Sequence, residues 1–302
     1  MKILVTGGAG YIGSHMVEAL LKKGAEVTVF DNLSYGHREA LSDKVKLVIG
    51  DTENEEALAR VFEDGNFDAV LHFAAFISMA ESVENPRIYF QNNVFNATNL
   101  FDVMIKYNVK KLIFSSTAGV YGNPEKIPIP EVHSCLPTNP YGESKLMVER
   151  ILKWYDQAYG LRSIALRYFN AAGASLDGHI GEDHDPETHI LPIAMKTALG
   201  VNSSFEIYGM DYPTRDGTCV RDYIHVVDLV EAHLNALDAL IANAKSNVYN
   251  VGTGNGYTNK EVIEMVKKVT GVNFTVDFTN KRPGDAIELV ASSEKLQQEL
   301  GW

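Results

Sequence analysis

The chain has 302 residues, which is enough for two domains or for one large α/β unit with an ample hydrophobic core. Its formal charge is −12, with 27 basic and 39 acidic residues, which disfavours nucleic acid or an anionic membrane surface as the main partner. Two cysteines give no disulfide framework, the amino terminus does not resemble a secretion signal, and no apolar run is long enough to span a bilayer. We therefore expect a cytoplasmic protein.

Short apolar runs alternate with helical patterns through the first half of the chain. Strands that are apolar on both faces, separated by helices, predict a parallel sheet covered on both sides. The predicted fold class is therefore α/β, a Rossmann-like doubly wound parallel sheet with a smaller carboxyl-terminal substrate domain. Strands are predicted at 2–6, 26–30, 45–49, 69–73, 111–115, 163–168 and 247–251, and helices at 14–23, 53–63, 92–107, 140–159, 228–242 and 259–270.

The regular alternation ends near Asn170. Residues 171–222 carry many Gly, Pro, Asp and His residues and only brief periodic stretches. We predict a nucleotide-binding domain at 1–170, to which elements near 226–251 return, and a second domain formed by 171–225 and 252–302. No linker or repeat separates the two, so we expect tight packing with a cleft between them.

A glycine-rich turn, TGGAGYIG at 6–13, follows the first predicted strand and opens the first helix. Its glycines allow the backbone to approach a pyrophosphate at the positive end of the helix dipole. Asp31 ends the second strand 18 residues after Gly13, where a carboxylate accepts hydrogen bonds from ribose hydroxyls and repels a 2′-phosphate. Asn32 follows it, rather than an arginine. The pattern predicts a dinucleotide site that prefers NAD over NADP.

Tyr141 and Lys145 lie four residues apart in YGESK, directly after Pro140, where a helix could begin. This spacing puts both side chains on one helical face. A lysine ammonium beside a phenol favours the phenolate, and a tyrosine with its ordinary pKa near 10 needs such help to act as a base. The pair is common on exposed helices, so its significance depends on the dinucleotide turn.

Several further segments occur in the same order as in a known family. The chain resembles the extended short-chain dehydrogenase/reductase family and, within it, the epimerases that act on carbon 4 of UDP-sugars. The resemblance covers nearly the whole chain. It is carried by TGGAGYIGSH, DNLS at 31–34, HFAA at 72–75, SSTAGVYG at 115–122, NPYGESKLMVE at 139–149, LRYFNAAGA at 166–174, TCVRDYIHV at 218–226, NVGTG at 250–254 and RPGD at 282–285.

The resemblance implies a redox-neutral interconversion of UDP-galactose and UDP-glucose through a 4-keto sugar, with NAD as the bound hydride carrier. Tyr141 is implied as the base, Lys145 as the group that lowers its pKa and binds the nicotinamide ribose, and Thr117 as a bridge to the sugar hydroxyl. Related dehydratases carry an Asp-Glu pair where this chain has Ala118 and Gly119, which cannot do proton chemistry, so removal of water is not expected.

The resemblance also implies the binding residues, position by position, with guanidinium groups on the diphosphate and no metal. His189 stands where the family places Asn or His near the phosphates, although a helix-capping or surface role explains it equally well. The implied cofactor residues are Gly7, Gly10, Tyr11, Ile12, Gly13, Asp31, Asn32, Asp51, Thr52, Phe73, Ala74, Ala75, Asn92, Tyr141, Lys145 and Phe169. The implied substrate residues are Thr117, Tyr141, Asn170, His189, Glu206, Tyr208, Arg221, Arg282, Asp285 and Leu289.

Three departures from the family pattern qualify these expectations. Ile77 stands where some relatives have a lysine near the cofactor phosphates, and Leu289 stands where some have a bulky tyrosine. The smaller Leu289 predicts room for an N-acetyl group, as in UDP-N-acetylglucosamine or its galactosamine epimer. Relatives usually carry a further helix beyond Trp302, which implies a truncated second domain.

Two alternative functions stay open at this stage. One is 4-epimerisation of another UDP-sugar, a pentose or a uronic acid, because the sequence does not define the pocket. The other is a catalytically silent, NAD-binding regulator, which an intact Thr117, Tyr141 and Lys145 argue against. The apolar surface of the helices at 92–107 and 140–159 predicts a homodimer, since relatives pair through these helices.

Overall fold

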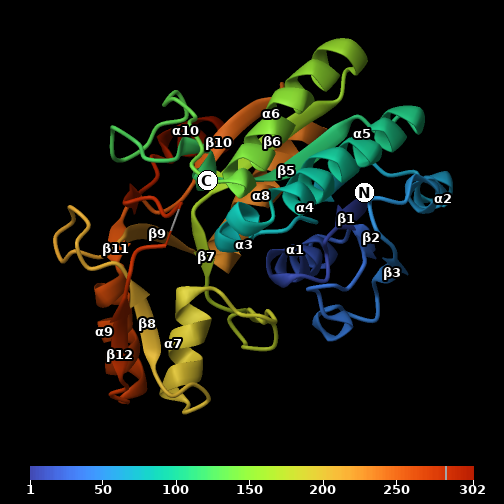
Figure 1. Ribbon diagram of the computed structural model, residues 1–302. Helices are drawn as coiled ribbons and strands as arrows, with labels where there is room; N and C mark the ends of the chain where they lie inside the picture. Colours follow the sequence, from blue (N-terminus) through green and yellow to red (C-terminus); the bar gives the residue numbers. More distant parts are fainter. Residues whose placement is uncertain (283) are drawn as a thin grey trace.

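The computed structural model describes residues 1–282 and 284–302 (Figure 1). At its centre is a seven-stranded sheet in the order β10-β6-β5-β4-β1-β2-β3, in which every neighbouring pair is parallel. The sheet confirms the α/β, Rossmann-like fold class. Its strands are β1 (Lys2–Thr6), β2 (Glu26–Asp31), β3 (Lys46–Ile49), β4 (Ala69–His72), β5 (Lys111–Thr117), β6 (Arg162–Tyr168) and β10 (Asn247–Val251).

Helices cover both faces of this sheet, and the pleat of β1 divides its residues between them. Ile3 and Val5 face one core cluster, and Leu4 faces the other, as expected for side chains that alternate along a strand. The first cluster is closed by α1 (Tyr11–Lys22) and α8 (Val226–Ile241), and the second by α2 (Glu55–Gly65), α5 (Asn96–Lys106) and α6 (Pro140–Tyr159).

The helix predicted at 92–107 is longer than expected and is not uniform. It begins as α4 (Pro86–Phe90), passes through a π-helical segment, η2 (Gln91–Phe95), and continues as α5. Pro86 takes the first helical position, where its missing N–H costs nothing. Asn92 therefore lies inside a helical run and does not open it, which corrects the sequence prediction. Before Asn170, three further short elements were not predicted: η1 (Arg38–Ala40), α3 (Met79–Glu84) and η3 (Ala118–Tyr121).

The irregular segment after Asn170 forms short strands that pair with partners distant in sequence. Figure 1 shows α7, β8, α9 and β12 gathered at one end of the molecule, away from the large sheet. The strand β9 is the centre of a second sheet, where it pairs with β7, β11 and β13. These elements are β7 (Asn170–Ala172), α7 (Ile190–Ala198), β8 (Phe205–Tyr208), β9 (Val220–His225), β11 (Gly256–Thr258), α9 (Asn259–Thr270), β12 (Val276–Thr279), β13 (Glu288–Leu289) and α10 (Glu294–Leu300).

Buried Asp222 ties this second sheet to the large one. Its carboxylate accepts hydrogen bonds from the backbone of Thr253 at 2.9 Å and of Gly254 at 2.9 Å, in the loop that follows β10. It also accepts one from the backbone of Ala291 at 3.1 Å, just after β13. The division into two domains at the predicted boundaries stays a prediction. None of the helices in the described ranges is long and apolar enough to cross a membrane.

Candidate active site

Two cavities meet at the carboxyl ends of the central strands, which is where ligands bind in doubly wound folds. The first cavity runs from the glycine turn across the sheet to Tyr141 and Leu289. The second opens between β9, the start of α7 and the segment around Arg282. The two are continuous, because they share the lining residues Ile77, Ser78, Met79, Asn170, Ala171, Glu182, Thr188, His189 and Arg221.

The glycine turn at one end of the first cavity is packed too closely for side chains at three of its positions, Gly7, Gly8 and Gly13. A Cβ on Gly7, which has φ of +71°, would lie 2.5 Å from the backbone nitrogen of Ala74. A Cβ on Gly13 would lie 2.1 Å from the carbonyl oxygen of Gly7. Gly10 has no neighbour closer than 3.5 Å at this position, and it lines the first cavity. The turn therefore presents bare backbone to a ligand at the amino end of α1.

Two carboxylates of the first cavity are held in place by backbone N–H groups. Asp31 accepts hydrogen bonds from Ala9 at 2.9 Å and from Leu33 at 2.8 Å. Asp51 accepts one from the backbone of Glu53 at 2.8 Å and one from the side-chain amide of Asn32 at 2.7 Å. Both carboxylates line the cavity, so their orientation is set before a ligand arrives.

Tyr141 lies in the first turn of α6, at the other end of the first cavity. The Asn139 side chain caps this helix by accepting a hydrogen bond from Gly142 at 2.9 Å. Thr117, the last residue of β5, lines the same part of the cavity as Tyr141. Lys145, one turn further along α6, is buried and is not among the lining residues; its ammonium donates to the carbonyl of Ser115 at 2.8 Å.

Burial controls the proton affinity of this group of residues. It raises the pKa of the Tyr141 phenol, while the Thr117 hydroxyl beside the phenol acts in the opposite direction. Burial also lowers the pKa of Lys145 to about 7. The net lowering of the Tyr141 pKa that the sequence predicted is therefore not found, because desolvation of the phenol outweighs the other influences.

A buried ion pair holds α6 against the sheet. Arg167 of β6 donates to both carboxylate oxygens of Glu149 of α6, at 2.9 and 2.6 Å, and these side chains are only 7% and 6% exposed. Arg167 also donates to the hydroxyl of Tyr121 at 2.9 Å, which in turn donates to Asn250 of β10 at 2.7 Å. Such a bidentate pair with its further hydrogen bonds satisfied fixes geometry as well as charge. It positions the helix that carries Tyr141.

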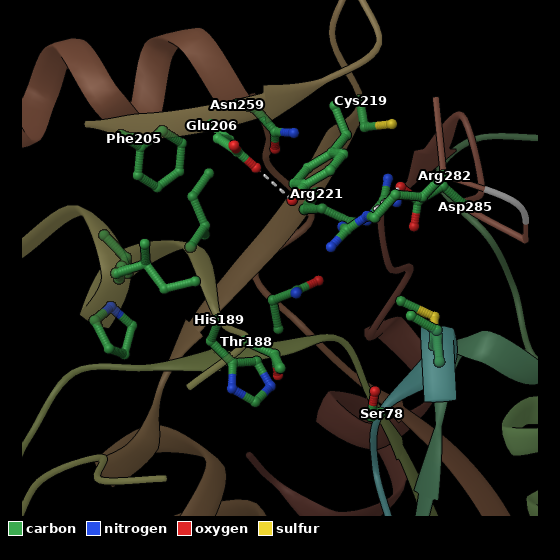
Figure 2. A pocket seen from close by; sticks show the side chains of 18 of the residues that line it. Ser78, Thr188, His189, Phe205, Glu206, Cys219, Arg221, Asn259, Arg282 and Asp285 are labelled. Carbon is green, nitrogen blue, oxygen red and sulfur yellow. Dashed lines mark hydrogen bonds and ion pairs between the residues drawn. The ribbon is translucent and has the colours of Figure 1, made fainter. Parts of the chain in front are cut away.

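The second cavity is lined by two guanidinium groups. Arg221 projects from β9, and Arg282 pairs with Asp285 at 3.2 Å and stacks on the ring of Tyr208 at 4.5 Å. Figure 2 shows Arg221, Arg282 and Asp285 together, with Thr188 and His189 across from them. The Tyr208 hydroxyl donates to Glu206 at 2.7 Å. Two arginines at one cavity suit a diphosphate or another anion with several oxygen atoms.

The structure brings the sequence-predicted residues together at these two cavities. All the predicted cofactor residues except Lys145 line the first cavity, as do Thr117 and Leu289 among the substrate residues. Glu206, Tyr208, Arg282 and Asp285 line the second, and Asn170, His189 and Arg221 line both. Pro283 of the RPGD motif lies outside the described residues.

Other lining residues were not predicted from the sequence, among them Tyr35, Phe76 and, in the segment 182–189, Glu182 and His184 beside the predicted His189. In that segment Glu182 and Glu187 raise the pKa of His184 to about 9. Burial alone would lower the pKa of His189, but the same two carboxylates raise it to about 9. The signal was present as E-D-H-D-P-E-T-H, in which alternating acidic and histidine residues stand close together.

Comparisons with known proteins agree with this geometry. The family model described as "NAD dependent epimerase/dehydratase family" matches residues 3–252. The chain is 49% identical to the UDP-glucose 4-epimerase of Lacticaseibacillus casei over 302 residues, which is 100% of this chain and 91% of that protein.

Among the solved structures that are similar over the whole chain are two UDP-sugar 4-epimerases. The UDP-glucose 4-epimerase of Bifidobacterium longum in complex with NAD⁺ and UDP is 41% identical, with a TM-score of 0.96 over 100% of this chain and 93% of that one. The UDP-Glc/GlcNAc 4-epimerase of Campylobacter jejuni is 43% identical, with a TM-score of 0.86 and the same coverage. From the family model, the full-length identity and the shared fold, this chain belongs to the NAD dependent epimerase/dehydratase family.

Proposed function

We propose that this protein interconverts UDP-galactose and UDP-glucose by transient oxidation at carbon 4 of the sugar, with NAD as its cofactor. One observation carries the proposal: a dinucleotide-type cavity that ends at Thr117 and Tyr141 is continuous with a second cavity lined by two arginines. A ligand whose diphosphate lies between the arginines can place its sugar beside Tyr141. The full-length relationship to UDP-glucose 4-epimerases supports the same activity.

The residues present fit NAD. The turn around Gly7, Gly10 and Gly13 exposes backbone N–H groups that can bind a pyrophosphate. The Asp31 carboxylate, held by two backbone N–H groups, can accept hydrogen bonds from ribose hydroxyls and would repel a 2′-phosphate. When bound, NAD supplies a hydride acceptor that takes hydrogen from carbon 4 and returns it.

The chain's own residues handle the proton and hold the sugar. Tyr141 takes the proton of the 4-hydroxyl and gives it back after inversion, and Thr117 orients that hydroxyl toward the phenol. Lys145, one helical turn away, favours the phenolate while it is protonated, which opposes the rise in the Tyr141 pKa that burial causes. Arg221 and Arg282 keep the diphosphate in place while the ketone turns over. Ala118 and Gly119 offer no acid or base, so no water is removed.

The proposal is tested with purified protein and UDP-galactose in the absence of added NAD. We expect UDP-glucose to accumulate to an equilibrium mixture. Tyr141→Phe should lower the rate by about 10²–10⁴-fold, which is the usual contribution of a positioned acid–base group, while bound nucleotide is retained. A wild-type protein that binds NAD without turnover would indicate the silent regulator instead. Faster conversion of a UDP-pentose or a UDP-uronic acid would move the assignment to that sugar.

We propose further that UDP-N-acetylglucosamine is accepted. Leu289 of β13 lines the first cavity and stands in register with Arg221 of β9, so it forms part of the wall beside the diphosphate site. The similar Campylobacter jejuni enzyme is named for both sugars. Leu289→Tyr would fill this wall and should lower turnover of the acetylated sugar by at least about 10-fold, as expected when a pocket loses one or more methylene-sized volumes. UDP-glucose turnover should change little. An equal loss for both sugars, or no turnover of the acetylated one by the wild type, would contradict this.

We also propose that the protein is a cytoplasmic homodimer. The large apolar side chains Phe95, Trp154 and Tyr159 are more than half exposed on the η2 and α6 segments, where a partner would cover them. Cys135 and Cys219 are both free, as a reducing compartment favours. Light scattering at micromolar concentration should give twice the chain mass of 33.3 kDa, and a monomer mass would refute the dimer.

A further inference from the structure

The segment 182–189 brings four potential metal ligands together beside the two cavities. It lies between β7 and α7 and contributes Glu182, His184, Glu187 and His189, each of which offers one ligand atom. These four atoms all lie within 4.8 Å of one another. Three of the side chains are sheltered, since those of Glu182, His184 and Glu187 are 7%, 12% and 5% exposed, and that of His189 is 36% exposed.

The distances within this tetrad suit a tetrahedral ion. His184 Nδ1 lies 3.5 Å from Glu182 Oε1 and 3.6 Å from Glu187 Oε2. His189 Nδ1 lies 2.8 Å from Glu182 Oε1 and 3.2 Å from Glu187 Oε1. Bonds of about 2.0–2.1 Å to a tetrahedral zinc ion put neighbouring ligand atoms about 3.3 Å apart. These four nitrogen–oxygen spacings, 2.8–3.6 Å, lie around that value and involve both oxygens of Glu187, and the four ligand atoms all lie within 4.8 Å of one another.

Two atoms of the tetrad are buried without a hydrogen-bond partner among the described residues. They are His184 Nδ1 and Glu187 Oε2, which face each other at 3.6 Å, too far apart for a good hydrogen bond. The other oxygen of Glu187 accepts hydrogen bonds from the backbone of Thr188 at 2.8 Å and of His189 at 2.9 Å. The carboxylate is thus locked with its free oxygen aimed at the tetrad. Buried polar atoms rarely stay unsatisfied, so a further partner, an ion or a water molecule, is indicated.

We propose that Glu182, His184, Glu187 and His189 form a binding site for one divalent metal ion of the zinc class. Two imidazole nitrogens and two carboxylate oxygens are the donors that zinc and neighbouring transition metals prefer, whereas magnesium and calcium favour oxygen alone. One dication neutralises the two carboxylates. The competing explanation is a pair of imidazolium–carboxylate contacts with no metal, and the experiment below separates the two.

Four protein ligands leave no open position, so the ion has a structural role. Glu182, Thr188 and His189 line both cavities, and the Tyr11 ring of the glycine turn lies edge-on to His184 at 6.4 Å. A metal ion here would hold the segment 182–189 in place between the nucleotide-binding first cavity and the second cavity, which contains the two arginines. It takes no part in the hydride or proton steps.

The test measures metal directly. Purified protein with its bound nucleotide is treated with EDTA, dialysed, and titrated with Zn²⁺ by calorimetry and with Co²⁺ by visible absorbance. We expect one Zn²⁺ per chain and the intense visible bands of tetrahedral Co²⁺. His184→Ala and Glu187→Gln should each weaken Zn²⁺ binding by at least about 10–100-fold, the loss already seen when only outer-shell partners of a metal are changed. His179→Ala is the matched control, because this histidine lies three residues before Glu182, is half exposed and is outside the tetrad.

Absence of Zn²⁺ binding would overturn the proposal, as would an affinity that His184→Ala and Glu187→Gln leave unchanged, since the ion would then sit on the surface. Circular dichroism and nucleotide content show whether the variants fold. If either variant misfolds, the wild-type Co²⁺ spectrum decides: a tetrahedral spectrum supports the site, and a weak octahedral spectrum refutes it.

Discussion

The two cavities present charge to their ligands by different means. The first cavity offers bare backbone at the turn around Gly10 and fixes its carboxylates with backbone N–H groups. The second offers the side chains of Arg221 and Arg282, which come from segments more than 50 residues apart. The carboxylates of the first cavity are therefore fixed by residues no more than 22 positions away in the chain, whereas the second cavity depends on how distant strands pair. Three sets of substitutions test this contrast: in the Arg167–Glu149 pair that holds α6, in the glycine turn, and in an arginine of the second cavity.

The largest effect on stability is expected at the buried Arg167–Glu149 ion pair, which holds α6 against the sheet beside the first cavity. Arg167→Met leaves Glu149 as a buried carboxylate without its partner and should lower the free energy of unfolding by about 3–5 kcal/mol. Chemical denaturation measures this. The double variant Arg167→Met with Glu149→Leu should recover most of the loss, because no buried charge stays unpaired. A single variant as stable as the wild type would show that the pair does not hold α6.

An intermediate effect is expected at the turn itself. Gly13→Ala forces a methyl group against the Gly7 carbonyl, and such overpacking costs about 1–3 kcal/mol, so both melting temperature and nucleotide content should fall. The methyl group of Gly10→Ala would make only an ordinary contact, 3.5 Å from the Gly7 carbonyl, so this variant should lower nucleotide content while the melting temperature of nucleotide-free protein is unchanged. Equal melting temperatures for the two variants would mean that the turn is not packed as described.

The smallest effect on stability is expected at an exposed side chain of the second cavity. Arg282→Ala should raise the KM for the UDP-sugar by about 10–100-fold, since hydrogen bonds to charged groups contribute about 1.5–3 kcal/mol, and should leave the bound nucleotide in place. Arg38→Ala is the matched control, because that arginine is 42% exposed against 43% for Arg282 and also pairs with an aspartate. A rise in KM for both variants, or loss of nucleotide with Arg282→Ala, would contradict the assignment of Arg282 to UDP-sugar binding in the second cavity alone.

The central sheet could be predicted from sequence because its strands are continuous apolar runs. The helix at 140–159 was predicted to the residue, since Pro140 starts it and Gly160, at φ of +69°, ends it. The run from Pro86 to Lys106 was placed less well, because the polar π-helical segment at 91–95 interrupts the apolar periodicity. The strands β8, β9 and β12 were missed because their pairing partners are distant and their own patterns are short.

The residues of the candidate site also differ in how far they could be predicted from the sequence. Gly7, Gly10, Gly13 and Asp31 follow from a local motif, whereas Arg221, Arg282 and Leu289 were identified only through the family resemblance. The proton affinities of Tyr141 and Lys145 could not be predicted, because spacing reveals which groups are neighbours but not how strongly burial desolvates them. The tetrad at 182–189 was missed because no helix or strand periodicity aligns its four side chains.

The central claim is a redox-neutral inversion in which the hydrogen on carbon 4 leaves and returns within the site. UDP-galactose carrying deuterium at carbon 4 tests it most directly, in ordinary water and without added NAD, with the product analysed by mass spectrometry and proton NMR. The account predicts UDP-glucose that retains the deuterium at carbon 4. Loss of the deuterium to solvent during conversion would contradict it.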